Sequence, residues 1–236
     1  MSNEMKRLTA PRSWPVKRKT SAWITKPSPG AHAIEESIPV NVVLRDLLHL
    51  CQTAQEVRQM LHDKLVLVDG KVATNLKQGL GLMDVLSLPK IDTHYRVVMD
   101  RRGKLQLVQV PGAKASWKLC RIEDKTTVPG GKTQLNLHDG RNILVEKDGY
   151  KTGDVLKIEV PSQKILDVYR LDKGSMALIT SGSHVGETAT VDEYTVTRLS
   201  ADNLVKFTNG TSTIKSNVFV VGAKGSEVEL PEEAAI

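Results

Sequence analysis

The chain has few aromatic residues and almost no cysteine. Aromatic side chains make up 4% of the 236 residues, which argues against an enzyme core lined with rings and favours small β-rich modules built from aliphatic side chains. The two cysteines, Cys51 and Cys120, are far apart in the sequence. A disulfide framework is therefore not predicted, and a reducing cytoplasm is the simplest setting.

Long apolar runs are also lacking. The longest, such as residues 65–68, fall far short of the roughly 20 residues that a membrane span needs. The positive charges at the N-terminus are not followed by the apolar stretch of a signal peptide. The sequence therefore predicts a soluble protein with no membrane partner.

Patterns that carry catalysis are incomplete. Residues 128–133 end in Gly-Lys-Thr, as a phosphate-binding loop does, but Thr126 stands where the first Gly is needed and no helix is predicted to follow. Ser183 and His184 are adjacent, yet the Ser is not centred between glycines as in a nucleophile elbow. We expect a β-turn at the first site, and no enzyme, cofactor or small-molecule substrate.

A metal site is not predicted either. His49, Cys51 and His62 lack the spacing of a ligand set, and Cys51 is expected on the apolar face of a helix. The other histidines considered, His32, His94 and His138, are isolated in the sequence. A core thiol is the simpler interpretation of Cys51.

What the chain does have is a strongly basic N-terminal arm. The net charge is +6, and residues 1–30 account for all of it, because they hold seven Lys and Arg against one Glu. Cations placed on phosphates release condensed counterions, so a basic arm joined to neutral modules suits a polyanion such as RNA. The predicted RNA contacts of the arm are Lys6, Arg7, Arg12, Trp14, Lys17, Arg18, Lys19, Trp23 and Lys26.

The arm has an alternative interpretation as a merely solvated tail. Trp14 and Trp23 disfavour it, because an exposed Trp is costly unless something covers it. Four prolines in residues 11–29 also prevent one long amphipathic helix, which weakens a membrane-surface role. We expect an arm that is disordered alone and orders on RNA.

Behind the arm, the pattern predicts a helix, a second helix and a hairpin. Residues 43–51 place Val43, Leu44, Leu47, Leu48 and Cys51 on one helical face. A capping box at residues 53–56 starts the second helix, and Asp69-Gly70 suits the turn of a tight hairpin between residues 64–68 and 71–72. A second hairpin joins residues 95–99 to 105–108 through a cationic turn at residues 100–104, which suits either phosphate contact or a solvated tip.

Beyond residue 111 the sequence predicts only short strands. Those expected in the middle of the chain are residues 134–137, 143–145, 155–160 and 165–169. From Gly174 on, residues 175–180, 188–191, 194–199, 204–208 and 217–221 supply about five more, enough for an SH3-like barrel. The sequence indicates a multi-domain α+β protein ending in a frayed acidic tail at residues 231–236.

Segments in order along residues 5–223 carry a resemblance to a known family. They are residues 5–11 (MKRLTAP), 38–40 (IPV), 44–46 (LRD), 68–72 (VDGKV), 81–85 (GLMDV), 95–96 (YR), 118–120 (KLC), 216–220 (SNVFV) and Gly222. Each is weak alone, but their order and spacing over nearly the whole chain resemble the small-subunit ribosomal protein family S-four-e of archaea and eukaryotes. The absence of a long basic C-terminal extension favours the archaeal type.

The resemblance implies four successive parts and a tail. They are a basic N-terminal arm (residues 1–40), an S-four-type RNA-binding fold (41–107), a central β module (108–172), a KOW-type SH3-like barrel (173–230) and the acidic tail (231–236). In such a family the helical pair and hairpin grip RNA, which here implies contacts from Arg45, Arg58, Lys64, Lys71 and Lys77. The KOW-like stretch departs from its pattern, with Ala189 in place of a usual Gly and Glu187 in place of a common basic residue. That loop is therefore expected to bind RNA less strongly, while the barrel persists.

The leading hypothesis is a structural constituent of the small ribosomal subunit that binds ribosomal RNA and neighbouring ribosomal proteins in the cytoplasm. The alternative is a pseudouridine synthase-like RNA-modifying enzyme with an appended S-four-type fold. Only 129 residues follow residue 107, and they have the pattern of two small β modules without a recognisable catalytic Asp. A third hypothesis, a transcription-elongation factor, is supported only by the incomplete KOW-like pattern.

Overall fold

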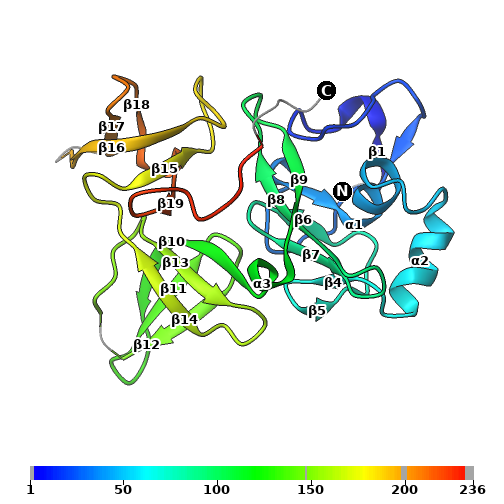
Figure 1. The fold of residues 1–236 in the computed structure, drawn as a ribbon, viewed down its shortest axis with the longest axis horizontal. Helices are drawn as coiled ribbons and strands as arrows, with labels where there is room; N and C mark the ends of the chain where they lie inside the picture. Colours follow the sequence, from blue (N-terminus) through cyan, green and yellow to red (C-terminus); the bar gives the residue numbers. More distant parts are fainter. Residues whose placement is uncertain (1–2, 147, 198–200, 232–236) are drawn as a thin grey trace. The chain divides into compact units, whose positions relative to one another are not determined.

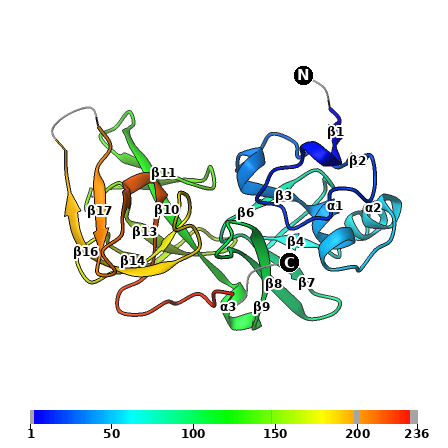
Figure 2. The same ribbon diagram turned by 90° about the horizontal axis from the view of Figure 1, so that it is seen from above.

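The computed structural model describes residues 3–146, 148–197 and 201–231 (Figure 1). It divides into two compact units, the first formed by Met1–Val98 and Lys104–Ser116 and the second by Met99–Gly103 and Trp117–Glu233. Both are built mostly from antiparallel strands, and the α-helices α1, α2 and α3 lie in the first unit (Figures 1 and 2). The prediction of a mixed fold with few helices and many strands is therefore confirmed. Of the predicted acidic tail, residues 232–236 lie outside the described residues.

The N-terminal arm is folded onto the first unit. Strand β1 (Met5–Lys6) pairs antiparallel with β2 (Trp23–Ile24), and a 3-10 helix at Arg7–Thr9 lies between them. Trp14 is only 2% exposed, and its indole N–H donates to the Ser37 carbonyl at 2.7 Å. The Ser13 carbonyl accepts from the amide of Leu105 at 2.8 Å. The structure thus differs from the expected disordered arm, because the arm's own apolar side chains find burial within the chain.

The first predicted helix is shorter, and more widely wound at its end, than its apolar spacing suggests. Helix α1 (Val40–Val42) follows strand β3 (Ser37–Pro39) and runs into a π-helical turn, Val43–Leu47, where the Leu48 amide donates to the Val43 carbonyl at 2.9 Å. His49 then takes a positive φ of 52°, which ends the helix before Cys51. Cys51 is buried but lies outside the helix, so the predicted nine-residue face is wrong at its last turn.

Local signals place the second helix and the hairpin correctly. Helix α2 (Ala54–His62) is capped by Thr53, whose hydroxyl accepts from the Glu56 amide at 3.3 Å, while the Glu56 carboxylate accepts from the Gln52 amide at 2.8 Å. Strands β4 (Leu67–Val68) and β5 (Lys71–Val72) meet at a turn whose residues Asp69 and Gly70 have φ of 48° and 72°. Both predictions are confirmed.

The hairpins of the first unit join one sheet. Its strand order is β5-β4-β7-β8-β9, where β7 spans Val85–Leu88, β8 Thr93–Met99 and β9 Leu105–Val110. Strand β6 (Gly79–Gly81) pairs instead with β3, which ties the end of the arm to the segment that follows β5. Helix α3 (Gly112–Ala115) ends the unit.

The second unit holds two five-stranded antiparallel sheets. The first has the order β12-β11-β10-β13-β14, with β10 at Trp117–Thr127, β11 at Thr133–Leu137, β12 at Asn142–Val145, β13 at Val155–Glu159 and β14 at Ile165–Tyr169. Long β10 pairs with both β11 and β13, and a register shift after Ile122 marks where it changes partner. Side chains of Cys120, Leu135 and Leu156 share its core. The four predicted strands are confirmed, and β10 is an additional one.

The second sheet has the order β18-β17-β16-β15-β19. Its strands are β15 (Met176–Ile179), β16 (Thr188–Thr195), β17 (Leu204–Phe207), β18 (Ser212–Ile214) and β19 (Val218–Gly222). Two of the predicted strands, at residues 188–191 and 194–199, form one continuous strand that ends at Thr195, and residues 198 and 199 lie outside the described residues. Between β10 and β11, residues 128–132 form the predicted reverse turn, in which the Gly131 amide donates to the Val128 carbonyl at 3.2 Å.

Candidate nucleic-acid interface

Strands β1 and β2 display a cation and an aromatic ring side by side. Lys6 and Trp23 are direct cross-strand partners, so their side chains lie on the same face of this small sheet. That face is open to solvent, since Trp23 is 55% exposed, whereas the neighbouring Ile24 is buried on the opposite face. An exposed ring beside an ammonium suits a nucleic-acid base with its phosphate, because every base has a face that stacks on an aromatic ring.

Most of the other predicted cations are on the surface of the first unit. Exposed or half-exposed positions are occupied by Lys6, Arg12, Lys17, Lys19, Lys26, Arg58, Lys64, Lys71 and Lys77. Arg58 lies on the outer side of α2, and Lys71 lies at the tip of the β4–β5 hairpin. Most of these side chains come from the arm, the helix and the hairpin, which are the elements that the sequence singled out. Lys64 lies just after α2, and Lys77 lies in the segment between β5 and β6.

Three predicted contact residues instead make bonds within the chain, and two of them, Arg7 and Arg18, hold the arm together. Arg7 is 4% exposed, and its guanidinium donates to the Asp46 carboxylate at 3.3 Å and to the Lys17 carbonyl. Arg45 donates to the same carboxylate at 2.8 Å. Arg18 donates to two carbonyls of the arm, those of Ala10 at 2.6 Å and Pro11 at 2.9 Å. These guanidiniums therefore act within the chain, as the buried ring of Trp14 also does.

Lys26 and Lys77 are brought together although they are 51 positions apart in the sequence. The Ser28 amide donates to the Lys77 carbonyl at 2.9 Å, and both lysines line one cavity of about 480 Å³. Their spacing in the sequence did not indicate this proximity, because it depends on how the arm packs against the segment between β5 and β6.

At Ala189 the KOW-like stretch has a backbone that any residue can adopt. Ala189 lies within β16, opposite Ala177 of β15, and is buried; it is not among the residues with positive φ. The strand therefore accepts Ala in place of Gly without strain. Glu187 lies 3.3 Å from the His184 ring, which adds a carboxylate to the loop before this strand.

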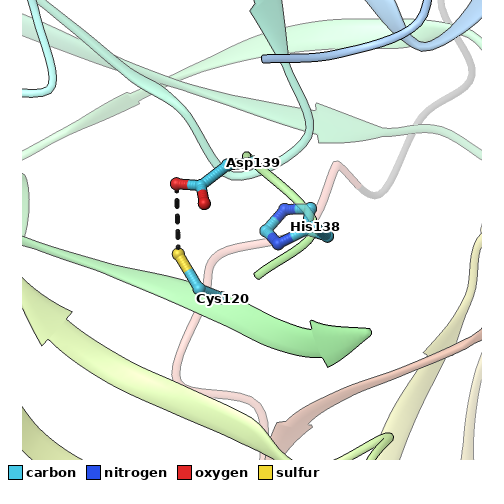
Figure 3. Close-up of side chains that lie close together, drawn as sticks. All are labelled: Cys120, His138 and Asp139. Atoms are coloured by element: carbon cyan, nitrogen blue, oxygen red, sulfur yellow. Dashed lines mark hydrogen bonds between the residues drawn. The ribbon is translucent and has the colours of Figure 1, made fainter. Parts of the chain in front are cut away.

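Cys120, His138 and Asp139 form a cluster whose possible ligand atoms lie within 4.8 Å of one another (Figure 3). His138 is thus not isolated in space, unlike in the sequence. The Asp139 carboxylate, however, already meets the Lys118 ammonium at 2.7 Å and the Arg141 guanidinium at 3.0 Å. Because these two cations would repel a metal ion and occupy its carboxylate ligand, the donor set does not fit a metal.

The same cations set the charge state of Asp139. Burial by itself raises the pKa of this carboxyl group, but the attraction of Lys118 and the other nearby cations outweighs it and holds the pKa below its ordinary value. The carboxylate is therefore ionised in the core of the second unit, where it compensates the wholly buried Lys118.

The histidines and cysteine near α2 do not form a ligand set. The Cys51 thiol donates to the Met60 sulfur at 3.1 Å, and burial raises its pKa. His49 and His62 are exposed. Cys51 is a core thiol, as the apolar pattern indicates. Within the described residues, no helix has the length and apolar character to cross a membrane.

Comparison with known proteins gives a consistent result over the whole chain. Residues 91–165 match the model of ribosomal family S4e, and residues 1–35 match that of the RS4NT (NUC023) domain. The chain is similar to "Small ribosomal subunit protein eS4" of Methanocella arvoryzae, with 44% identity over 96% of this chain and 97% of that protein. The protein of the same name from Picrophilus torridus is 37% identical over 100% of both chains.

A solved structure supports the fold. The crystal structure of the 30S ribosomal protein S4e from Thermoplasma acidophilum matches with a TM-score of 0.70 and 37% identity, covering 80% of this chain and 96% of that one. The likeness in sequence and the likeness in structure point to the same family.

Proposed function

The chain belongs to ribosomal family S4e, and from this premise we propose that it holds ribosomal RNA through the exposed cations of its first unit. It is a structural constituent of the small ribosomal subunit rather than an enzyme, which sets aside the RNA-modifying alternative. The proposed partners are the small-subunit ribosomal RNA and the adjacent ribosomal proteins, in the cytoplasm.

The observation that carries the proposal is the Lys6–Trp23 pair on β1 and β2, together with the exposed cations of the arm. Lys17 and Lys19 are exposed in the same arm. The arm is anchored by Trp14, Arg7 and Arg18, so it presents these groups without first having to fold. A preformed cationic surface loses less conformational entropy on binding than a disordered arm does.

We further propose how the family's modules divide this chain. The helical pair and hairpin within residues 41–107 correspond to an S-four-type RNA-binding fold, residues 108–172 to the central β module and residues 173–230 to a KOW-type SH3-like barrel. The order of α1, α2 and the β4–β5 hairpin supports the first assignment, and the five strands β15–β19 support the last. Arg58, Lys64, Lys71 and Lys77 are the proposed contacts of the S-four-type fold.

Sedimentation tests the assignment to the subunit. A lysate of the native cells is run through a gradient at low and then at high salt, and each fraction is probed for this protein. We expect the protein to remain with the small subunit after the high-salt wash. A protein that runs free, or that washes off readily, would indicate a dissociable factor and contradict the proposal.

Replacing Trp23 tests the stacking surface. The Trp23→Ala change is expected to weaken binding of the full chain to small-subunit ribosomal RNA by about 1–3 kcal/mol, the contribution of one stacked base. Because Trp23 is 55% exposed, the free energy of unfolding should change by less than about 0.5 kcal/mol.

Leu8→Ala is the matched control, because Leu8 is 65% exposed in the same arm but offers no ring. It should leave both RNA affinity and stability unchanged. Equal losses of affinity in the two variants would show that Trp23 has no stacking role.

A further inference from the structure

The cavity beside Lys26 and Lys77 has the features of a binding site for a single nucleotide. Its volume of about 480 Å³ lies within the range of roughly 300–1,000 Å³ that small-molecule sites occupy. Its walls are largely apolar, with Pro27, Pro29 and Ile34 among them. The cavity lies wholly within the first unit, on the arm and the segment before β6.

The polar groups of the cavity favour an anionic occupant. Both lysines are half-exposed at its surface, and none of the described residues that line it is a carboxylate. The Asn3 amide and the Ser28 hydroxyl provide hydrogen-bonding groups of the kind that read a base edge. An apolar space lined by two cations, an amide, a hydroxyl and the His32 ring matches a planar base joined to phosphate.

The cavity is rigidly built. The buried His32 ring lies 3.1 Å from the Asp84 carboxylate, which also accepts from the Gly81 amide at 2.9 Å. The Lys77 segment is fixed on both sides, because the Ser28 amide donates to the Lys77 carbonyl and the Val40 amide to the Gln78 carbonyl, each at 2.9 Å. The two sides of the cavity, formed by the arm and by the segment around Lys77, are therefore held in place before a ligand binds.

We propose that this cavity takes one unpaired base of the ribosomal RNA, turned out of its stack, with the adjoining phosphates on Lys26 and Lys77. Protein recognition of RNA commonly uses such splayed bases, which enter apolar pockets and expose their edges to polar side chains. The inference rests on the proposed function and adds to it a site that reads a base rather than the backbone alone.

The test fills the cavity and maps the RNA. Ala33 lines the cavity, is exposed and has an extended backbone, so Ala33→Trp places a ring in the space without disturbing the core. The full chain is bound to small-subunit ribosomal RNA transcribed in vitro, and the reactivity of each nucleotide is mapped with dimethyl sulfate and a 2′-hydroxyl acylating reagent. We expect the variant to lose protection of one unpaired nucleotide and to bind about tenfold more weakly.

Matched variants complete the design. Ala113→Trp, at an exposed alanine of the same unit outside the cavity, should keep the wild-type footprint. Lys77→Ala should expose the same nucleotide and lower the slope of log affinity against log salt by about 1, with Lys90→Ala as its exposed control. If Ala33→Trp does not fold, comparing the footprints of Lys77→Ala and Lys90→Ala still tests the nucleotide site.

The outcomes separate the two proposals. A wild-type chain that protects no nucleotide would contradict the proposed function itself. A wild-type footprint and affinity that persist in the Ala33→Trp and Lys77→Ala variants would overturn the nucleotide site alone. Variants that keep the footprint but assemble poorly into subunits would overturn it as well, by assigning the cavity to a side chain of a neighbouring protein.

Discussion

Replacing Asp139 by Asn is expected to lower the free energy of unfolding of the second unit by about 3–5 kcal/mol. The Asp139 carboxylate is almost wholly buried and lies 2.7 Å from the Lys118 ammonium, which is 0% exposed. Asn keeps the shape of the side chain but removes the charge that compensates Lys118 and Arg141. Urea denaturation of the full chain, followed by circular dichroism, measures the loss.

The exposed pair of Lys206 and Glu193 in the same unit provides the control. Its two side chains are 55% and 58% exposed, so Glu193→Gln should change stability by less than about 1 kcal/mol. If Asp139→Asn falls within that range too, the buried charge cluster does not stabilise the unit as inferred.

Asp139 also makes the stability of the second unit depend on pH. The folded pKa of Asp139 is held below its ordinary value, so its contribution is fully present above the unfolded pKa, about 4. It is lost as the pH falls through the lower, folded pKa. The stability of the wild type should therefore drop more steeply below pH about 4 than that of the Asp139→Asn variant.

Replacing Trp14 by Ala is expected to cost the first unit about 3–5 kcal/mol. The ring is 2% exposed, and its N–H satisfies the carbonyl of Ser37, which is itself buried. Removing it leaves a cavity and an unsatisfied acceptor beneath the arm. Denaturation of the full chain, together with the rate of tryptic cleavage in the arm, measures how firmly the arm remains attached.

Trp14→Phe separates the two contributions, because it loses the hydrogen bond but keeps the larger part of the apolar ring. It should cost less than half as much as Trp14→Ala. An arm that resists trypsin equally well in the wild type and in Trp14→Ala would show that Trp14 does not anchor it.

Sequence patterns predicted best where neighbours in the chain decide the structure. The Thr53 cap and the Asp69-Gly70 turn depend on a few adjacent residues, and both are present as expected. The long strand β10 was not predicted, because Lys118 interrupts its apolar pattern. That lysine is buried only because Asp139, 21 positions later, lies against it.

In the candidate interface, too, the sequence did not predict contacts between residues far apart in the chain. Composition placed the cations in the arm, but it did not distinguish the exposed Lys17 from Arg7, whose partner Asp46 is 39 positions away. Trp14 and Trp23 have equivalent surroundings in the sequence, yet one ring is core and the other is surface. Only the tertiary pairing of the arm with residues 37–46 tells which groups remain for RNA.

The salt dependence of RNA binding tests the central claim, that the exposed cations of the first unit hold the ribosomal RNA. The Arg12→Gln, Lys17→Gln and Lys19→Gln triple variant removes three exposed arm cations, and its control removes three exposed lysines of the second unit, Lys151, Lys164 and Lys224, by the same change. Affinity of the full chain for small-subunit ribosomal RNA is measured from low to high salt. We predict that the slope of log affinity against log salt falls in magnitude by about 2–3 in the arm variant and is unchanged in the control. Equal slopes in the arm variant and the wild type would contradict the account.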